Sequence, residues 1–165
     1  MFDIPAEQNT SYSLLVTQVD ALCRGESDTL ANLANVASLL YITLTEVNWV
    51  GFYIVRGEEL VLGPFQGKPA CVRIPFGKGV CGNVASMKKS LMVNNVEAFP
   101  GHIACDADSR SEIVLPLFKN DELVAVLDID SPVPERFTDD DLQGLSDVVS
   151  ALQPLLDLSQ LLYHG

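Results

Sequence analysis

The chain has 165 residues, a length that suits one domain with a full hydrophobic core. Its composition, 48% apolar and 19% charged, is typical of a globular protein rather than a disordered one. The net charge of −12 and the scattered basic residues disfavour binding to nucleic acid or to an anionic membrane surface. Because no apolar run approaches the roughly 20 residues of a membrane span and the first residues lack the pattern of a secretory signal, we expect a cytoplasmic protein that acts on a small molecule or a protein partner.

Helical patterns lie at both ends of the chain. Residues 28–45 place apolar side chains three and four positions apart, and Asp28 can cap the start of this helix. A weaker pattern predicts an earlier helix over residues 11–24. Thr138 and the acids that follow it form the capping-box start of a final helix that runs through Leu155.

The middle of the chain has the composition and turn signals of strands. The expected elements are a hairpin over 49–63, a strand over 70–74, a short helix over 77–88, a brief strand over 91–93 and a second hairpin over 112–130. The irregular segment before the second hairpin, residues 94–111, has a length that is usually functional or disordered. Helices first and last around these strands predict an α+β fold with a central antiparallel sheet of about six strands flanked by helices.

The four cysteines are Cys23, Cys71, Cys81 and Cys105. Without an export signal, permanent disulfides are not expected, so the options are inert core thiols, metal ligands or redox catalysis. No CxxC or HxxxH pair occurs and only two histidines are present, so we predict no metal site. A Cys-His-Asp hydrolase using Cys105 and His102 is conceivable, but a base three residues from its nucleophile would be unusual.

The surroundings of the four thiols differ. Cys105 is the sharpest candidate for a reactive thiol, because it lies in a small polar loop rather than in an apolar run. Cys81 follows two glycines at the expected start of a helix, where backbone N–H groups stabilise a thiolate, although a packed core cysteine is an equal alternative. Cys71 is predicted to share a strand face with Arg73, which makes a core role less natural. We interpret Cys23, in the first helix, as structural.

Three acids converge at one end of the predicted second hairpin. The period of a strand puts Asp128 and Asp130 on one face, continuing Val124 and Val126. Glu112 opens the preceding strand, and antiparallel pairing brings that start beside the end of the next strand. Such carboxyl groups could line the mouth of a cavity, where crowding raises one pKa so that the group donates a proton. Solvated acids in a turn are the alternative interpretation.

Two aromatic residues share a predicted strand. Trp49, the only tryptophan, and Tyr53 lie four positions apart, so the strand period places both on one face. Core packing is the default interpretation for both, and an aromatic wall of a ligand pocket is the alternative.

Seven segments of the chain carry a family resemblance: 48–53, 62–68, 70–72, 79–82, 101–106, 111–116 and 126–130. Together they resemble the free methionine-(R)-sulfoxide reductases, enzymes built on a GAF domain. The likeness spans residues from about 28 to 145, and the set is more specific than any single segment, because a GAF fold alone implies only a ligand pocket. The resemblance implies one GAF domain over residues 1–165, with its core at about 28–160.

The resemblance also implies roles for particular residues. Cys105 matches the nucleophile, Cys71 the principal resolving thiol, and Cys81 a third cysteine that can join disulfide exchange. The residues that match the substrate-contacting acids and the pocket aromatics are Glu112, Asp128, Asp130, Trp49 and Tyr53. Cys23 lies outside the family pattern and is assigned no role.

The activity implied by the resemblance is reduction of free L-methionine-(R)-sulfoxide to L-methionine. Cys105 would attack the sulfur and become a sulfenic acid, and Cys71 would condense with it to a disulfide that thioredoxin reopens. No bound cofactor is implied; NADPH would act through thioredoxin reductase, and the family is typically homodimeric. The alternatives are a non-catalytic GAF sensor of a small ligand and a thiol peroxide sensor that uses Cys105 and Cys71.

Overall fold

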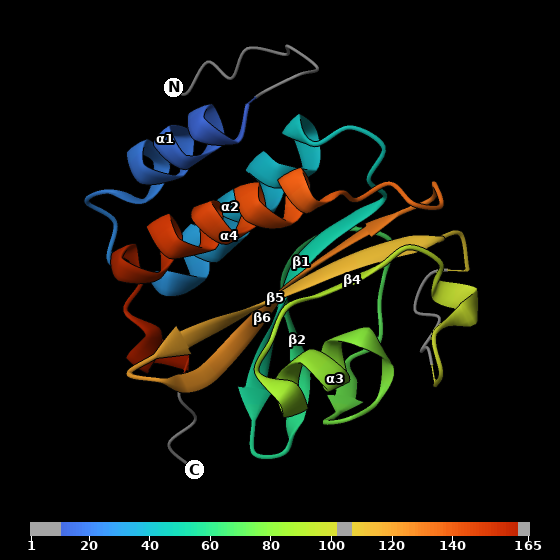
Figure 1. The fold of residues 1–165 in the computed structure, drawn as a ribbon. Coiled ribbons are helices and arrows are strands. Elements are labelled where there is room, and N and C mark those ends of the chain that lie inside the picture. The colour runs from blue at the N-terminus through green and yellow to red at the C-terminus, as the bar shows by residue number, and fades with distance from the viewer. Residues whose placement is uncertain (1–10, 102–106, 162–165) are drawn as a thin grey trace.

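A six-stranded antiparallel sheet forms the centre of the protein, with helices on both of its faces (Figure 1). The structure is a computed structural model that describes residues 11–101 and 107–161. The strand order is β3-β2-β1-β6-β5-β4, and every neighbouring pair is antiparallel. The elements in chain order are α1 (Tyr12–Cys23), α2 (Thr29–Thr43), β1 (Trp49–Arg56), β2 (Glu59–Gly67), β3 (Arg73–Pro75), α3 (Gly79–Met87), β4 (Leu91–Val93), η1 (Val96–Ala98), β5 (Ser111–Lys119), β6 (Glu122–Ser131), α4 (Asp139–Leu152), η2 (Gln153–Leu155) and η3 (Leu158–Leu161). The predicted α+β fold with about six antiparallel strands is confirmed.

The sheet separates two hydrophobic layers. Helices α1, α2 and α4 cover one face, and α3 lies against the other (Figure 1). Alternate residues of one strand enter different layers: Phe52 of β1 packs toward the three helices, and Tyr53 packs toward α3. Leu127 and Val126 of β6 divide in the same way. The site described below lies in the smaller layer, on the α3 side.

The helix starts follow from their capping residues. The Asp28 side chain accepts a hydrogen bond from the backbone N–H of Ala31, 2.9 Å away, and α2 begins at the next residue, Thr29. Before α4, Thr138 and Asp141 form a reciprocal capping box. The helices predicted from these two signals are therefore confirmed.

Two details of the predicted strands are wrong. The third strand begins at Arg73, so Cys71 precedes it and shares no strand face with Arg73. Only three residues of β3 pair with β2, and the chain before them lines the cavity, where Ala70 is part of the wall. On β6, a register shift opposite Leu117 moves Val124 to the layer of the three helices, so it does not share the face of the acids.

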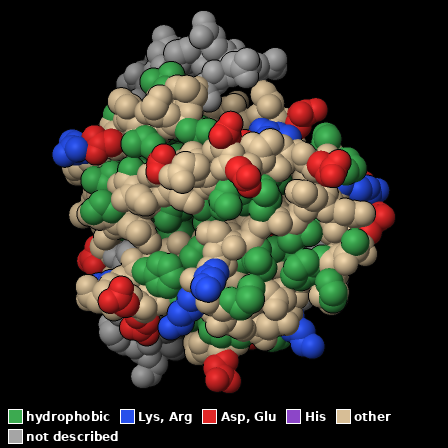
Figure 2. All heavy atoms as spheres, in the orientation of Figure 1, with side chains coloured by type: hydrophobic (Ala, Val, Ile, Leu, Met, Phe, Trp, Pro, Cys, Tyr) green, Lys and Arg blue, Asp and Glu red, His purple; other side chains and the backbone are tan. Residues whose placement is uncertain are grey.

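The surface is mixed in character. Lys and Arg side chains occur at several separate places on the face shown in Figure 2, among acidic and apolar ones. Exposed large apolar side chains include Leu30 and Ile42 on α2. Within residues 11–101 and 107–161, no helix is long and apolar enough to cross a membrane. The side chains that form the candidate site described below lie inside the fold, on the α3 side of the sheet.

Replacing Gly144 by alanine should destabilise the protein, although alanine is the better helix former. The ring of Tyr12 on α1 lies over Gly144 of α4, and a Cβ there would be 2.0 Å from Tyr12 Cγ. The ring is also held by its hydroxyl, which donates to Asp141 at 2.5 Å. We expect a loss of about 1–3 kcal/mol in the free energy of unfolding, measured by urea denaturation. Ser150→Ala, an exposed change on the same helix, is the control. A gain of about 1 kcal/mol in the free energy of unfolding of Gly144→Ala would show that the helix propensity of alanine outweighs the clash with Tyr12.

Candidate active site

A cavity opens on the α3 side of the sheet. It brings together six of the residues proposed from the sequence, which are Trp49, Tyr53, Cys81, Glu112, Asp128 and Asp130. They come from β1, α3, β5 and β6, so the sheet supplies most of the wall and α3 closes over it. Long-range pairing, rather than a local motif, therefore builds this site.

Strand register places the three acids side by side. Glu112 of β5 pairs directly with Asp130 of β6, and two residues earlier on β6 Asp128 pairs with Val114. Because side chains alternate along a strand, all three carboxyl groups point to the same face of the sheet. The predicted convergence of Glu112 with the two aspartates is confirmed by this register.

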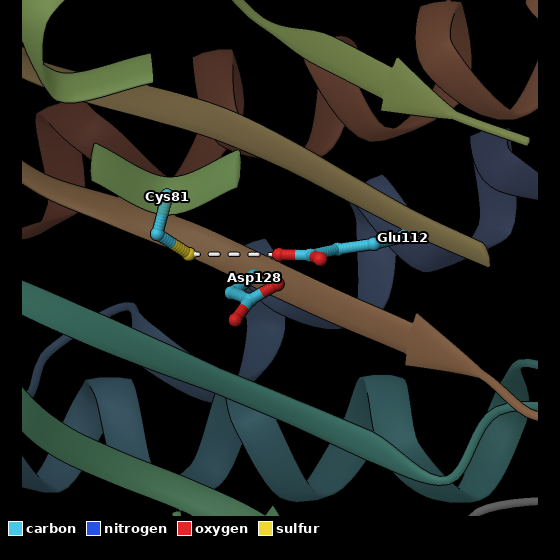
Figure 3. Close-up of side chains that lie close together, drawn as sticks. All are labelled: Cys81, Glu112 and Asp128. Carbon is cyan, nitrogen blue, oxygen red and sulfur yellow. Dashed lines mark hydrogen bonds between the residues drawn. The ribbon is translucent and has the colours of Figure 1, made fainter. Parts of the chain in front are cut away.

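The thiol of Cys81 lies beside two of these acids (Figure 3). Cys81 is in the first turn of α3, and its Sγ donates a hydrogen bond to Glu112 Oε1 at 3.8 Å. Cys81, Glu112 and Asp128 are only 3%, 6% and 6% exposed. Within the described part of the chain, Asp128 Oδ1 is buried and has no hydrogen-bond partner. The cavity thus contains a buried acceptor that a ligand can satisfy.

The acids favour their protonated forms. Burial raises the pKa of the Glu112 carboxyl well above its usual value, and the neighbouring charge of Asp130 raises it further. Burial likewise raises the pKa of Asp128, with a further contribution from Glu112. Two close carboxyl groups in a site of low polarity cannot both ionise cheaply, which favours a proton on one of the pair.

Cys81 is held as a neutral thiol. Burial raises the pKa of Cys81 well above its usual value, and the charges of Asp128 and Glu112 add to the effect. The sequence left open a thiolate or a packed core cysteine at this helix start, and the nearby carboxyl groups oppose the influence of the backbone N–H groups on the thiol. The partners that decide this outcome lie 31 and more residues away along the chain, so the local sequence gave no sign of them.

The aromatic wall of the cavity is a stack of rings, and hydrogen bonds to the backbone hold two of these rings in place. The rings of Trp49 and Tyr53 lie 5.8 Å apart at 25°, and Phe65 stacks on the other side of Trp49 at 5.3 Å and 15°. Trp49 Nε1 donates to the Lys68 carbonyl at 3.1 Å, and the Tyr53 hydroxyl donates to the Cys71 carbonyl at 2.9 Å. Both aromatics therefore line the cavity, and their hydrogen bonds hold the segment from Lys68 to Cys71 beside it.

Three contributors to the site were missed in the sequence. Gly51 makes room for the stack, because a Cβ there would lie 2.5 Å from both Trp49 Cη2 and Phe65 Cβ. At the rim, the exposed ammonium of Lys68 pairs with Asp108, which lowers the pKa of that carboxyl. Gly51 lies inside a run of β-forming residues, which was a usable sequence signal that another part of the chain approaches the backbone closely there. The ion pair joins residues 40 positions apart, which no spacing rule links.

The cysteines fall into distinct environments. Cys71 lies between β2 and β3 beside the cavity, is partly buried and is disulfide-bonded. Cys105, the predicted nucleophile, lies outside the described residues. Cys23 is free and buried among the helices, where burial raises its pKa to about 11. This placement agrees with the structural role expected for Cys23.

The fold and its pocket are those of a GAF domain, and the family model of the GAF domain matches residues 20–152. A curated relative from Escherichia coli (strain K12), named free methionine-R-sulfoxide reductase, is 52% identical over 145 residues, which is 88% of this chain and 88% of that protein. The solved structure of the reduced form of fRMsr of Staphylococcus aureus has a TM-score of 0.86 and 47% identity, covering 94% of this chain and 99% of that one. The structure of free methionine-R-sulfoxide reductase from Neisseria meningitidis in complex with its substrate has a TM-score of 0.86 and 42% identity, covering 90% of each chain.

The chain belongs to the free methionine-R-sulfoxide reductase family of GAF-domain proteins. The family predicted from the seven sequence segments is thereby confirmed. Members with this name are oxidoreductases.

Proposed function

We propose that this protein reduces free L-methionine-(R)-sulfoxide to L-methionine. The observation that carries the proposal is the buried pair of Glu112 and Asp128, whose pKa values are raised by burial, inside a cavity with an aromatic wall. Relatives from Escherichia coli and Saccharomyces cerevisiae carry the name of this activity. A sulfoxide oxygen leaves only after it gains protons, and a buried carboxylic acid is a suitable donor.

The covalent steps belong to the cysteines. The Cys105 thiolate attacks the sulfoxide sulfur, and the oxygen, assisted by the proton of a carboxyl group, ends on Cys105 as a sulfenic acid. The sulfoxide sulfur gains two electrons and departs as the thioether of methionine, while the cysteine sulfur loses two. The Cys71 thiol then condenses with the sulfenic acid, releasing water and forming a disulfide. In support, Cys71 is disulfide-bonded beside the cavity.

The acids also explain selection of the free amino acid. The substrate carries an ammonium group, whose charge a neutral site would leave without a partner. Asp128 Oδ1, a buried acceptor at the cavity, and the neighbouring carboxyl of Asp130 are suitable partners for it. A methionine sulfoxide residue within a peptide has an amide instead of an ammonium and continues into more chain. The site therefore favours the free amino acid over a protein substrate.

The reductant and the assembly are proposals that rest on the family resemblance. Thioredoxin would attack the disulfide by thiol exchange, with NADPH supplying the electrons through thioredoxin reductase. A homodimer is the expected assembly. No bound cofactor is needed for the steps above, because both electrons come from cysteine thiols.

A coupled assay with separated epimers should show NADPH consumption with free methionine-(R)-sulfoxide and little or none with the S epimer. The reaction mixture contains the protein, thioredoxin and thioredoxin reductase, and methionine is quantified as product. N-acetyl-methionine-(R)-sulfoxide is the matched control, because it keeps the sulfoxide and lacks the ammonium group. Equal rates with both epimers, or with hydrogen peroxide alone, would refute the proposal and favour the peroxide sensor. Tight binding without turnover would favour the non-catalytic GAF sensor.

A further inference from the structure

Cys81, Glu112 and Asp128 form a compact set of metal-binding donor atoms. One donor atom from each, a sulfur and two carboxylate oxygens, lies within 4.8 Å of the others. Figure 3 shows the three side chains converging from α3, β5 and β6 onto one point. Donors on three separate elements are held in place by the fold, so little rearrangement is needed to bring them together.

The spacing suits a small tetrahedral cation. With a metal–sulfur bond of about 2.3 Å and metal–oxygen bonds of about 2.0 Å, tetrahedral angles place sulfur and oxygen about 3.5 Å apart. The distance from Cys81 Sγ to Glu112 Oε1 is 3.8 Å, close to that requirement. Calcium and magnesium select oxygen ligands, whereas a thiol sulfur favours zinc and cations of similar softness.

A second observation points to a ligand at this place. Asp128 is 6% exposed, and its Oδ1 atom is buried without a hydrogen-bond partner in the described part of the chain. The same carboxyl group belongs to the donor set and lines the cavity. The cavity also leaves room for a fourth ligand, such as water, which is the arrangement of an open zinc site.

We propose that Cys81, Glu112 and Asp128 bind a divalent cation of the zinc class, in competition with the substrate. The proposed reaction needs no metal. A cation bound here therefore acts as an inhibitor, because it competes with the substrate. The proposal goes beyond the proposed function, because cation binding does not depend on which substrate the cavity accepts.

Cobalt(II) is the probe for this site, because a cobalt–thiolate bond gives a charge-transfer absorption in the near ultraviolet. The protein is used with its Cys71 disulfide intact, so that this sulfur cannot ligate. We expect one equivalent of cobalt to bind with the charge-transfer band, and zinc chloride to displace it. Methionine-(R)-sulfoxide should raise the apparent dissociation constant for cobalt. Cobalt binding that shows the band and is unaffected by methionine-(R)-sulfoxide would refute the competition, whereas the coupled assay tests the proposed substrate separately.

Matched variants decide which thiol and which acid bind. Cys81→Ser should abolish the band, and Asp128→Asn should weaken binding by about tenfold or more. Cys23→Ala is the control, because Cys23 is the other free cysteine of the described chain and is buried in the helical layer. Its cobalt spectrum should match that of the unaltered protein. Absence of the band in the unaltered protein, or a band that survives in Cys81→Ser, would overturn the proposal.

Discussion

Replacing Cys105 by serine should abolish turnover with either thioredoxin or dithiothreitol as the reductant. A serine hydroxyl is not ionised near neutral pH and does not form a sulfenic acid, so the oxygen of the sulfoxide has no acceptor. We expect the rate of methionine formation to fall by ~10³-fold or more. The measurement is NADPH oxidation in the coupled assay, together with direct quantification of methionine by chromatography.

Two companion variants make this result specific. Cys71→Ser should stall the thioredoxin cycle, while dithiothreitol restores much of the activity because it reduces the Cys105 sulfenic acid directly. Cys23→Ala should keep its rate, since Cys23 is buried on the opposite side of the sheet. If Cys105→Ser kept the full rate and Cys81→Ser lost it, the nucleophile would be Cys81, against its raised pKa.

The fold could be predicted because its signals are local. Asp28 and Thr138 cap helices whose buried faces follow the helical period. The two hairpins have short turns, so the pairing of neighbouring strands follows from the chain order. The convergence of Glu112 with Asp130 is a direct consequence of the second hairpin and needed no information from distant segments.

Features that depend on distant segments could not be predicted. The register shift that moves Val124 away from the acids lies in the pairing of β5 with β6, and no residue type marks it. The neutral state of Cys81 depends on Glu112 and Asp128, which α3 meets only after the sheet has formed. The start of β3 after Cys71 reflects a chain segment that lines the cavity instead of extending the sheet. In each case the deciding interaction joins residues that are remote in the sequence.

Replacing Asp128 by asparagine should lower activity and raise stability. Asparagine keeps the shape of the side chain but supplies neither a negative charge for the ammonium group nor an acidic proton. Breaking a buried charge pair of this kind costs about 3–5 kcal/mol, so kcat/KM should fall by roughly 10²–10⁴-fold. The change is measured with free methionine-(R)-sulfoxide. A rate with hydrogen peroxide that falls in parallel would contradict the role of Asp128 in binding the amino acid.

The stability gain should depend on pH in a definite direction. Burial raises the pKa of Asp128 in the folded protein. The stability that the Asp128 side chain contributes is therefore fully present below the unfolded pKa of about 3.9, and it is lost as the pH rises through the folded pKa. Asparagine does not titrate, so the two proteins should have similar stability below pH of about 4 and diverge above it. Near neutral pH we expect the variant to be more stable by about 1–2 kcal/mol in urea denaturation. Asp147→Asn, an exposed change on α4, is the control and should show no such divergence. A difference between Asp128→Asn and the unaltered protein that stays constant with pH would mean that the carboxyl group does not retain its proton in the fold.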